Sequence, residues 1–134
     1  MHRGYIKLGA FLSALSVLMG AFASHLLKKY LGPDGLGTFQ TGVQYQFYHS
    51  IALLITGILL KRYPNQLVIW AGRLFVLGII FFSGSLYLLA LLESFKGIGL
   101  GAFGLLTPIG GLFFVAGWIL LLVGVPSEKS MGND

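Results

Sequence analysis

Charged residues are missing from four long segments of this chain. Residues 8–27, 35–60, 74–92 and 97–127 contain no Lys, Arg, Asp or Glu. At about 1.5 Å per helical residue, the shortest segment approaches the roughly 30 Å thickness of a bilayer's hydrocarbon core, and the others reach or exceed it. The sequence therefore predicts a membrane protein, and these segments leave no room for a soluble domain.

The composition and the charge limit the classes of partner that we expect. Apolar residues make up 56% of the chain and charged residues 10%, and the net charge is +5. The basic residues stand singly or in pairs at segment ends, a pattern typical of topology signals beside phospholipid. We therefore expect membrane lipid as a partner and no nucleic acid. The absence of Cys excludes disulfides, thiolate metal sites and cysteine nucleophiles.

The architecture follows from short connections that contain turn-forming residues. We predict one all-α transmembrane domain over residues 1–134, with four helices at about 5–29, 35–61, 66–92 and 98–125 in an up-down antiparallel bundle. Pro108 cannot donate a hydrogen bond to the Gly104 carbonyl, so the fourth helix should be kinked or broken near Pro108. The first segment is also typical of an export signal, but we expect it to remain as the first helix.

The basic residues also predict the topology. With four spans, one side of the membrane collects Arg3, Lys7, Lys61, Arg62, Arg73 and Lys129, and the other collects Lys28, Lys29 and Lys96. Because positive charge favours the cytoplasmic side, both termini are expected in the cytoplasm.

Small residues mark the expected helix contacts, because helices associate in lipid by close packing. The first helix carries them on one face, and the fourth has two glycine stripes that repeat every seven residues. Two glycine faces indicate two neighbours: both lie inside the bundle, or one is another copy of the protein. The predicted packing positions are Gly9, Ser13, Ser16, Gly20, Ser24, Gly104, Gly110, Gly111 and Gly117.

Polar side chains in the second helix need partners, because lipid offers none. Side chains at the same depth in the membrane can meet across neighbouring helices. Matching the polar residues by this depth predicts two clusters. The mid-membrane cluster comprises Tyr45, Gln46, His49, Ser83, Ser85 and Thr107, and it is either a polar packing core or the narrow part of a ligand or ion path. The outer-end cluster comprises His25, Gln40 and Gln44, with His25 as a hydrogen-bonded structural residue.

The two histidines do not predict a shared metal site. His25 and His49 differ in depth by roughly 12 Å at about 1.5 Å per residue, whereas metal–imidazole bonds are about 2 Å long. Haem or quinone binding, with haem held between two copies, is the third hypothesis for function. We expect no catalytic residue, metal or cofactor, because the chain has no catalytic triad, acid pair, HExxH, phosphate loop or dinucleotide motif.

Four blocks in order carry a resemblance to a known family: GAFASHLLKKYL, TFQTGVQYQFYHSIALL, AGRLFVLGIIFFSGSLYLLAL and LTPIGGLFFVAGW. Together they resemble the domain of unknown function 423 family of small bacterial inner-membrane proteins. The resemblance implies a four-helix protein of the inner (plasma) membrane without an assigned reaction.

These observations favour a non-catalytic accessory or structural protein that packs with itself or within a larger membrane complex. The alternative is a binder or conduit for a small molecule, lipid or ion through the cluster around His49.

Overall fold

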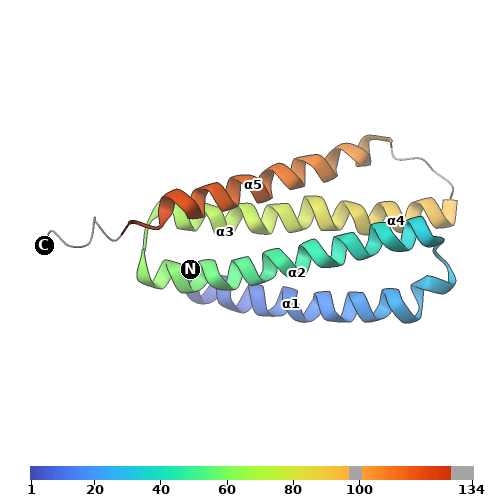
Figure 1. The fold of residues 1–134 in the computed structure, drawn as a ribbon, viewed down its shortest axis with the longest axis horizontal. Helices are drawn as coiled ribbons and strands as arrows, with labels where there is room; N and C mark the ends of the chain where they lie inside the picture. The colour runs from blue at the N-terminus through green and yellow to red at the C-terminus, as the bar shows by residue number, and fades with distance from the viewer. Residues whose placement is uncertain (97–100, 128–134) are drawn as a thin grey trace, which may run out of the picture.

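Four helices of membrane-spanning length make up the structure. This structure, a computed structural model, describes residues 1–96 and 101–127, apart from the side chains of residues 94–96, 102 and 103. The four spans cover His2–Lys29, Pro33–Arg62, Gln66–Glu93 and Leu106–Gly124. They alternate in direction, and the described parts of the two termini lie at the same end of the bundle (Figure 1). The predicted all-α antiparallel fold is confirmed.

The first two spans are simple hairpin partners. Helix α1 (His2–His25) continues into the short 3-10 turn η1 (Leu27–Lys29), and α2 follows at Pro33–Arg62. Pro33 opens α2 at a position where its missing N–H costs nothing, because the first-turn donors have no partner within the helix.

The third span is one rod with an irregular centre. Helix α3 (Gln66–Gly78) passes into a π-helical segment, η2 (Ile79–Ser83), and then into α4 (Gly84–Lys96). Asn65 organises its start, because its Oδ1 accepts from the Val68 amide at 3.1 Å and its Nδ2 donates to the Gly124 carbonyl at 2.8 Å. One side chain thus caps α3 and ties it to the end of the fourth span.

The fourth span begins later than the sequence predicted. A 3-10 segment, η3 (Gly101–Leu105), precedes α5 (Leu106–Gly124), in which Pro108 occupies the first turn. Proline is tolerated there, so the helix starts anew just before Pro108 instead of bending around it. The predicted break near Pro108 is confirmed, although the α-helix begins well after residue 98.

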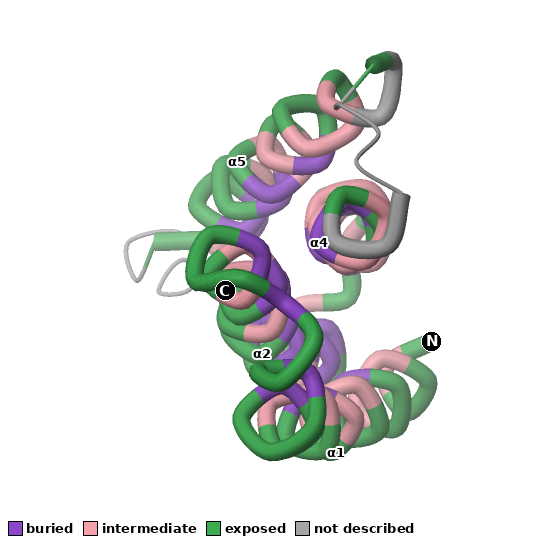
Figure 2. The backbone as a smooth tube through the Cα atoms, turned by 90° about the vertical axis from the view of Figure 1, so that its right-hand side faces the viewer, coloured by how far each residue is buried: buried purple, intermediate pink, exposed green. Residues whose placement is uncertain are grey.

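The helices form a row more than a closed bundle. Helix α1 packs mainly along α2, and α5 packs mainly along α3 and η2, while α2 contacts the third span (Figures 1 and 2). In the most apolar windows of α2 and the third span, 44% and 39% of residues are buried, against 17% for α1 and 22% for α5. The outer helices therefore present most of their surface to the surroundings.

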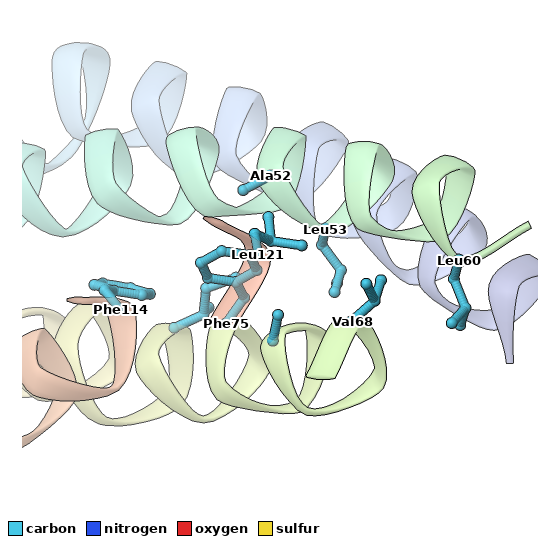
Figure 3. Close-up of a cluster of buried hydrophobic side chains, with 9 residues drawn as sticks. Ala52, Leu53, Leu60, Val68, Phe75, Phe114 and Leu121 are labelled. Carbon is cyan, nitrogen blue, oxygen red and sulfur yellow. The ribbon is translucent and has the colours of Figure 1, made fainter. Parts of the chain in front are cut away.

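Two apolar clusters hold the row together. The larger joins α2, α3, η2 and α5 at the end that carries the termini (Figure 3), with Ala52, Leu53, Leu60, Val68, Ala71, Phe75, Ile79, Phe114 and Leu121 buried. The smaller joins the opposite end of α1 to α2 and α4 through Ala23, Leu27, Leu31, Phe39 and Ala90.

Candidate functional site

The small-residue face of α1 lies partly against α2. A Cβ atom added to Gly9 would lie 2.8 Å from the Ser50 carbonyl oxygen, so the two backbones are in close contact at this point. Ser16 is buried and donates to the Leu12 carbonyl at 2.9 Å. Along the same face, Gly20 has room for a methyl group beside Val43, and Ser24 is exposed.

The two glycine stripes of α5 differ in their surroundings. Gly110, Gly117 and Gly124 are buried against the third span, and a Cβ on Gly110 would collide with the Phe82 backbone. On the other stripe, Gly104 and Gly111 are half-buried, and a Cβ on Gly111 would make ordinary contact with Phe82 at 3.8 Å. The first stripe therefore sets the distance between α5 and η2.

His49 is held at both ring nitrogens. Its Nδ1 lies 2.8 Å from the Tyr45 carbonyl oxygen, which can only accept, so Nδ1 carries the proton. The Nε2 atom is then an acceptor, and it receives the Trp118 indole N–H at 3.1 Å. These two bonds describe a neutral imidazole, the form that burial among apolar groups favours.

Aromatic rings enclose the same imidazole. The Phe114 ring stacks on it with a centroid separation of 3.5 Å and an interplanar angle of 7°. Phe75 lies 5.7 Å away, and Tyr45 and Trp118 each lie 6.0 Å away, measured between centroids. A ligand or metal at Nε2 would have to displace Trp118, so this arrangement is that of a packing residue.

Gln46 links three helices through its amide. Its Nε2 donates to the Leu12 carbonyl of α1 at 3.0 Å, and its Oε1 accepts the Tyr87 hydroxyl of α4 at 2.7 Å. The side chain is buried, so both polar ends exchange lipid or water for protein partners.

The mid-membrane cluster predicted from the sequence is divided. Ser85 and Thr107 do meet, with their hydroxyl oxygens 2.6 Å apart, and Ser85 also bonds the Phe82 carbonyl at 2.9 Å. His49 instead reaches Phe114 and Trp118, further along α5 than Thr107. The depth matching was wrong here because it started the fourth helix near residue 98, whereas α5 begins at Leu106.

Two buried hydroxyls have no partner among the described residues. Ser83, at the end of the π-helical segment, is fully buried, and Ser13 has a buried Oγ. Most helical serines can bond the carbonyl four residues earlier, as Ser50 does with Gln46. In η2 the changed hydrogen-bond register alters that geometry.

The outer-end residues remain separate. His25, Gln40 and Gln44 are all exposed, and no hydrogen bond joins them in the described part of the chain. Their predicted mutual hydrogen bonding is absent there. Among the described residues, no group of three His, Asp or Glu side chains could hold a metal ion.

Trp118 and Tyr87 are important residues that the predicted clusters did not include. Both carry a hydrogen-bond donor within an apolar span, and such a donor needs an acceptor on a neighbouring helix. That requirement could have identified them, but it does not name the acceptor.

Two open grooves lie on the outer surfaces. A groove of about 350 Å³ lies between α1 and α2, lined by Ser16, Val17, Gly20, Ala21, Val43, Gln44, Phe47 and Tyr48. A second groove, of about 330 Å³, lies on α3 beside Trp70, Arg73, Val76 and Leu77. His49, Ser83 and Thr107 line neither groove.

Comparison with known proteins agrees with this architecture. The family described as "Protein of unknown function (DUF423)" matches residues 19–111. A UPF0382 membrane protein of Staphylococcus haemolyticus is 41% identical over 119 residues, which cover 89% of this chain and 92% of the relative. The UPF0382 inner membrane protein YgdD of Escherichia coli K12 is 40% identical over 116 residues, which cover 87% of this chain and 84% of that protein.

No solved structure matches the chain. The family suggested by the four sequence blocks is confirmed, as is the location in the inner membrane with several spans. The molecule is therefore a small multi-pass membrane protein that belongs to the DUF423 family.

Proposed function

We propose that this protein is a non-catalytic structural component of the membrane that assembles with a second copy of itself through the outer side of α1 and α2. The observation that carries the proposal is the presence of polar side chains on an otherwise apolar exposed surface. Gln44 and Tyr48 point outward from the middle of the 30-residue helix α2, and Tyr48 is 56% exposed.

Exposure of these groups to hydrocarbon is unfavourable. An amide or hydroxyl without a hydrogen-bond partner costs several kcal/mol (roughly 4–8) in an alkane-like medium. The exposed positions of α5, by contrast, include Leu112, Val115, Ile119 and Leu122, which suit lipid. The α2 surface is therefore better suited to contact with protein.

The groove beside these groups supports a helix as the occupant. Gly20 and Ala21 form part of its wall, and small residues allow helix backbones to approach closely in a membrane. Gln44 lies on its rim, and an amide is both donor and acceptor. Two copies related by a two-fold axis can therefore pair Gln44 with Gln44, which supports a second copy as the partner.

The interior favours a packing role over a conduit. His49 and Gln46 use both of their polar ends in bonds between or within helices. Transport through this region would require those bonds to break.

Crosslinking tests the proposal directly, because the chain has no native cysteine. Phe47→Cys places a thiol in the groove, and Leu112→Cys provides the control. Phe47 and Leu112 each precede by two residues a member of the His49–Phe114 stack, so the two positions lie at similar depth. With a short bismaleimide in native membranes, we expect a dimer-sized product from Phe47→Cys and only monomer from Leu112→Cys.

The added substitution Gln44→Leu should weaken the association. Hydrogen bonds between membrane helices contribute about 0.6 kcal/mol each and up to about 1.7, so loss of the symmetric pair predicts a roughly three- to twentyfold weaker association and a lower dimer yield. Monomer alone from Phe47→Cys would overturn the proposal, as would equal dimer from both single-cysteine variants. A product of a different mass would identify another protein as the occupant and overturn the assignment of a second copy.

A further inference from the structure

Arg73 lies within the third span, close to the Gln66 end. It is exposed on α3, about two turns from the helix start at Gln66, and it is the only Lys, Arg, Asp or Glu between Gln66 and Leu92. An arginine at the bilayer centre would cost about 2.5–3.5 kcal/mol, so its position near the end of the span matters. From this depth the side chain can reach the headgroup region.

The neighbours of Arg73 position its guanidinium. The guanidinium carbon lies 4.7 Å from the centroid of the Trp70 ring, in a cation–π contact. The Tyr5 ring packs against Gly72, next to Arg73 in the chain, and the Tyr5 hydroxyl donates its proton to the Ile69 carbonyl at 2.7 Å. The guanidinium is therefore the group that can donate to an anion here.

Among the residues that the structure describes, the charge at the end of the molecule near Arg73 has one sign. The same end of the molecule carries Arg3, Lys7, Lys61 and Arg62. Among the described residues, the two acidic side chains lie at the opposite end, Asp34 in the first turn of α2 and Glu93 at the end of the third span, so none of them neutralises Arg73. The described part of this end therefore attracts anions.

The groove beside Arg73 has an almost entirely apolar surface, with the Arg73 side chain among the residues that line it. Arg73 and Trp70 line its outer part, and Val76 and Leu77 line the part that lies one turn deeper along α3. Its volume of about 330 Å³ exceeds what a phosphate group needs and leaves room for part of an acyl chain. The Arg73 guanidinium thus belongs to a residue that lines an apolar groove able to hold part of an acyl chain.

We propose that this groove is a binding site for one anionic phospholipid at the end of the molecule that carries the termini. The Arg73 guanidinium donates to the phosphate oxygens, and the acyl chain lies along Val76 and Leu77. Arginine suits this role because its planar fork can make two parallel hydrogen bonds to a phosphate.

Native mass spectrometry of the purified full-length protein, titrated with phosphatidylglycerol, tests the site. Arg73→Gln should reduce the occupancy of the first bound lipid at least fivefold. Arg62→Gln is the matched control: it removes the same charge at the same end, and Arg62 lies over Tyr63 at 5.8 Å, outside the groove. The control should bind as the wild type does.

Two further variants keep the test decisive if Arg73→Gln misfolds. Arg73→Lys retains the charge without the fork and should bind with intermediate occupancy. Leu77→Trp fills the groove with Arg73 intact and should also lose the lipid. Equal binding by wild type, Arg73→Lys and Leu77→Trp would overturn the proposal, as would an equal loss in Arg62→Gln.

The identity of the lipid is tested separately. Phosphatidylcholine at the same concentration should give at least fivefold lower occupancy, and inorganic phosphate should not displace phosphatidylglycerol. Equal binding of phosphatidylcholine would overturn the requirement for an anionic lipid. Displacement by inorganic phosphate would overturn the role of the acyl chain.

Discussion

The side chain of Gln46 joins three helices by hydrogen bonds. Its amide accepts from Tyr87 and donates to the Leu12 carbonyl, so α1 and α4 are both joined to α2 at one level. An amide with only one of these bonds would leave a buried polar atom unpaired, which costs about 1–3 kcal/mol. Both partners are therefore needed for the glutamine to stabilise the fold.

Tyr87→Phe isolates one of those bonds, because it removes only the hydroxyl group. We expect the free energy of unfolding to fall by about 1 kcal/mol, since Gln46 Oε1 loses its donor in a buried setting. Tyr30→Phe is the control: Tyr30 is 66% exposed, and its loss of a hydroxyl should be neutral. Denaturation by SDS in mixed micelles measures both variants, and equal stabilities would contradict the importance of this bond.

At the scale of the helices, Gly110 sets the approach of α5 to η2. Gly110→Ala should destabilise the protein by about 1–3 kcal/mol, because its methyl group would collide with the Phe82 backbone. Gly111→Ala, at the next residue of α5, is the matched control, because a Cβ added there makes only an ordinary contact. Since alanine favours a helix over glycine by about 1 kcal/mol, Gly111→Ala should be neutral or stabilising.

The same SDS denaturation measures both alanine variants. The result that contradicts the proposed contact is a Gly110→Ala protein at least as stable as Gly111→Ala. Loss of helix content in Gly111→Ala alone would contradict the distinction between the two glycine stripes.

The sequence predicted which segments span the membrane better than it predicted which residues of neighbouring helices lie at the same level. Missing charges locate the membrane-spanning segments, because a charged group in hydrocarbon is costly wherever it lies. They do not locate the start of an α-helix within an uncharged stretch, so His49 was matched with Thr107 although it contacts Trp118. Propensity also does not predict the π-helical segment Ile79–Ser83, because its hydrogen-bond register depends on tertiary contacts.

Contacts in the candidate site were predicted correctly only where two consecutive spans meet at one end of the molecule. Ser85 and Thr107 were grouped correctly, because Ser85 lies near the end of the third span and Thr107 near the start of the fourth, on the same side of the membrane. The partner of Gln46 on α1 is a backbone carbonyl, which every residue possesses, so no sequence pattern distinguishes Leu12. A polar residue in a span therefore indicates that a hydrogen-bond partner exists, but it does not identify that partner.

At the scale of the whole molecule, charge predicts the orientation in the membrane. The end with the termini carries Arg3, Lys7, Lys61, Arg62 and Arg73, whereas the opposite end carries Lys28, Lys29 and Lys96 and both described acidic residues. Positive charge is retained on the cytoplasmic side during insertion, so the end with the termini is predicted to face the cytoplasm. Anionic phospholipid bound at Arg73 would then belong to the cytoplasmic leaflet.

Single-cysteine labelling tests this orientation in a chain that has no cysteine of its own. Tyr30→Cys and Gln66→Cys place exposed thiols at opposite ends without altering the charges. A membrane-impermeant maleimide should label Tyr30→Cys in intact spheroplasts and Gln66→Cys only after lysis, because only the first thiol faces outward. The reverse pattern would show that the outer Lys28 and Lys29 determine the topology, and labelling of both variants before lysis would indicate a mixture of the two orientations.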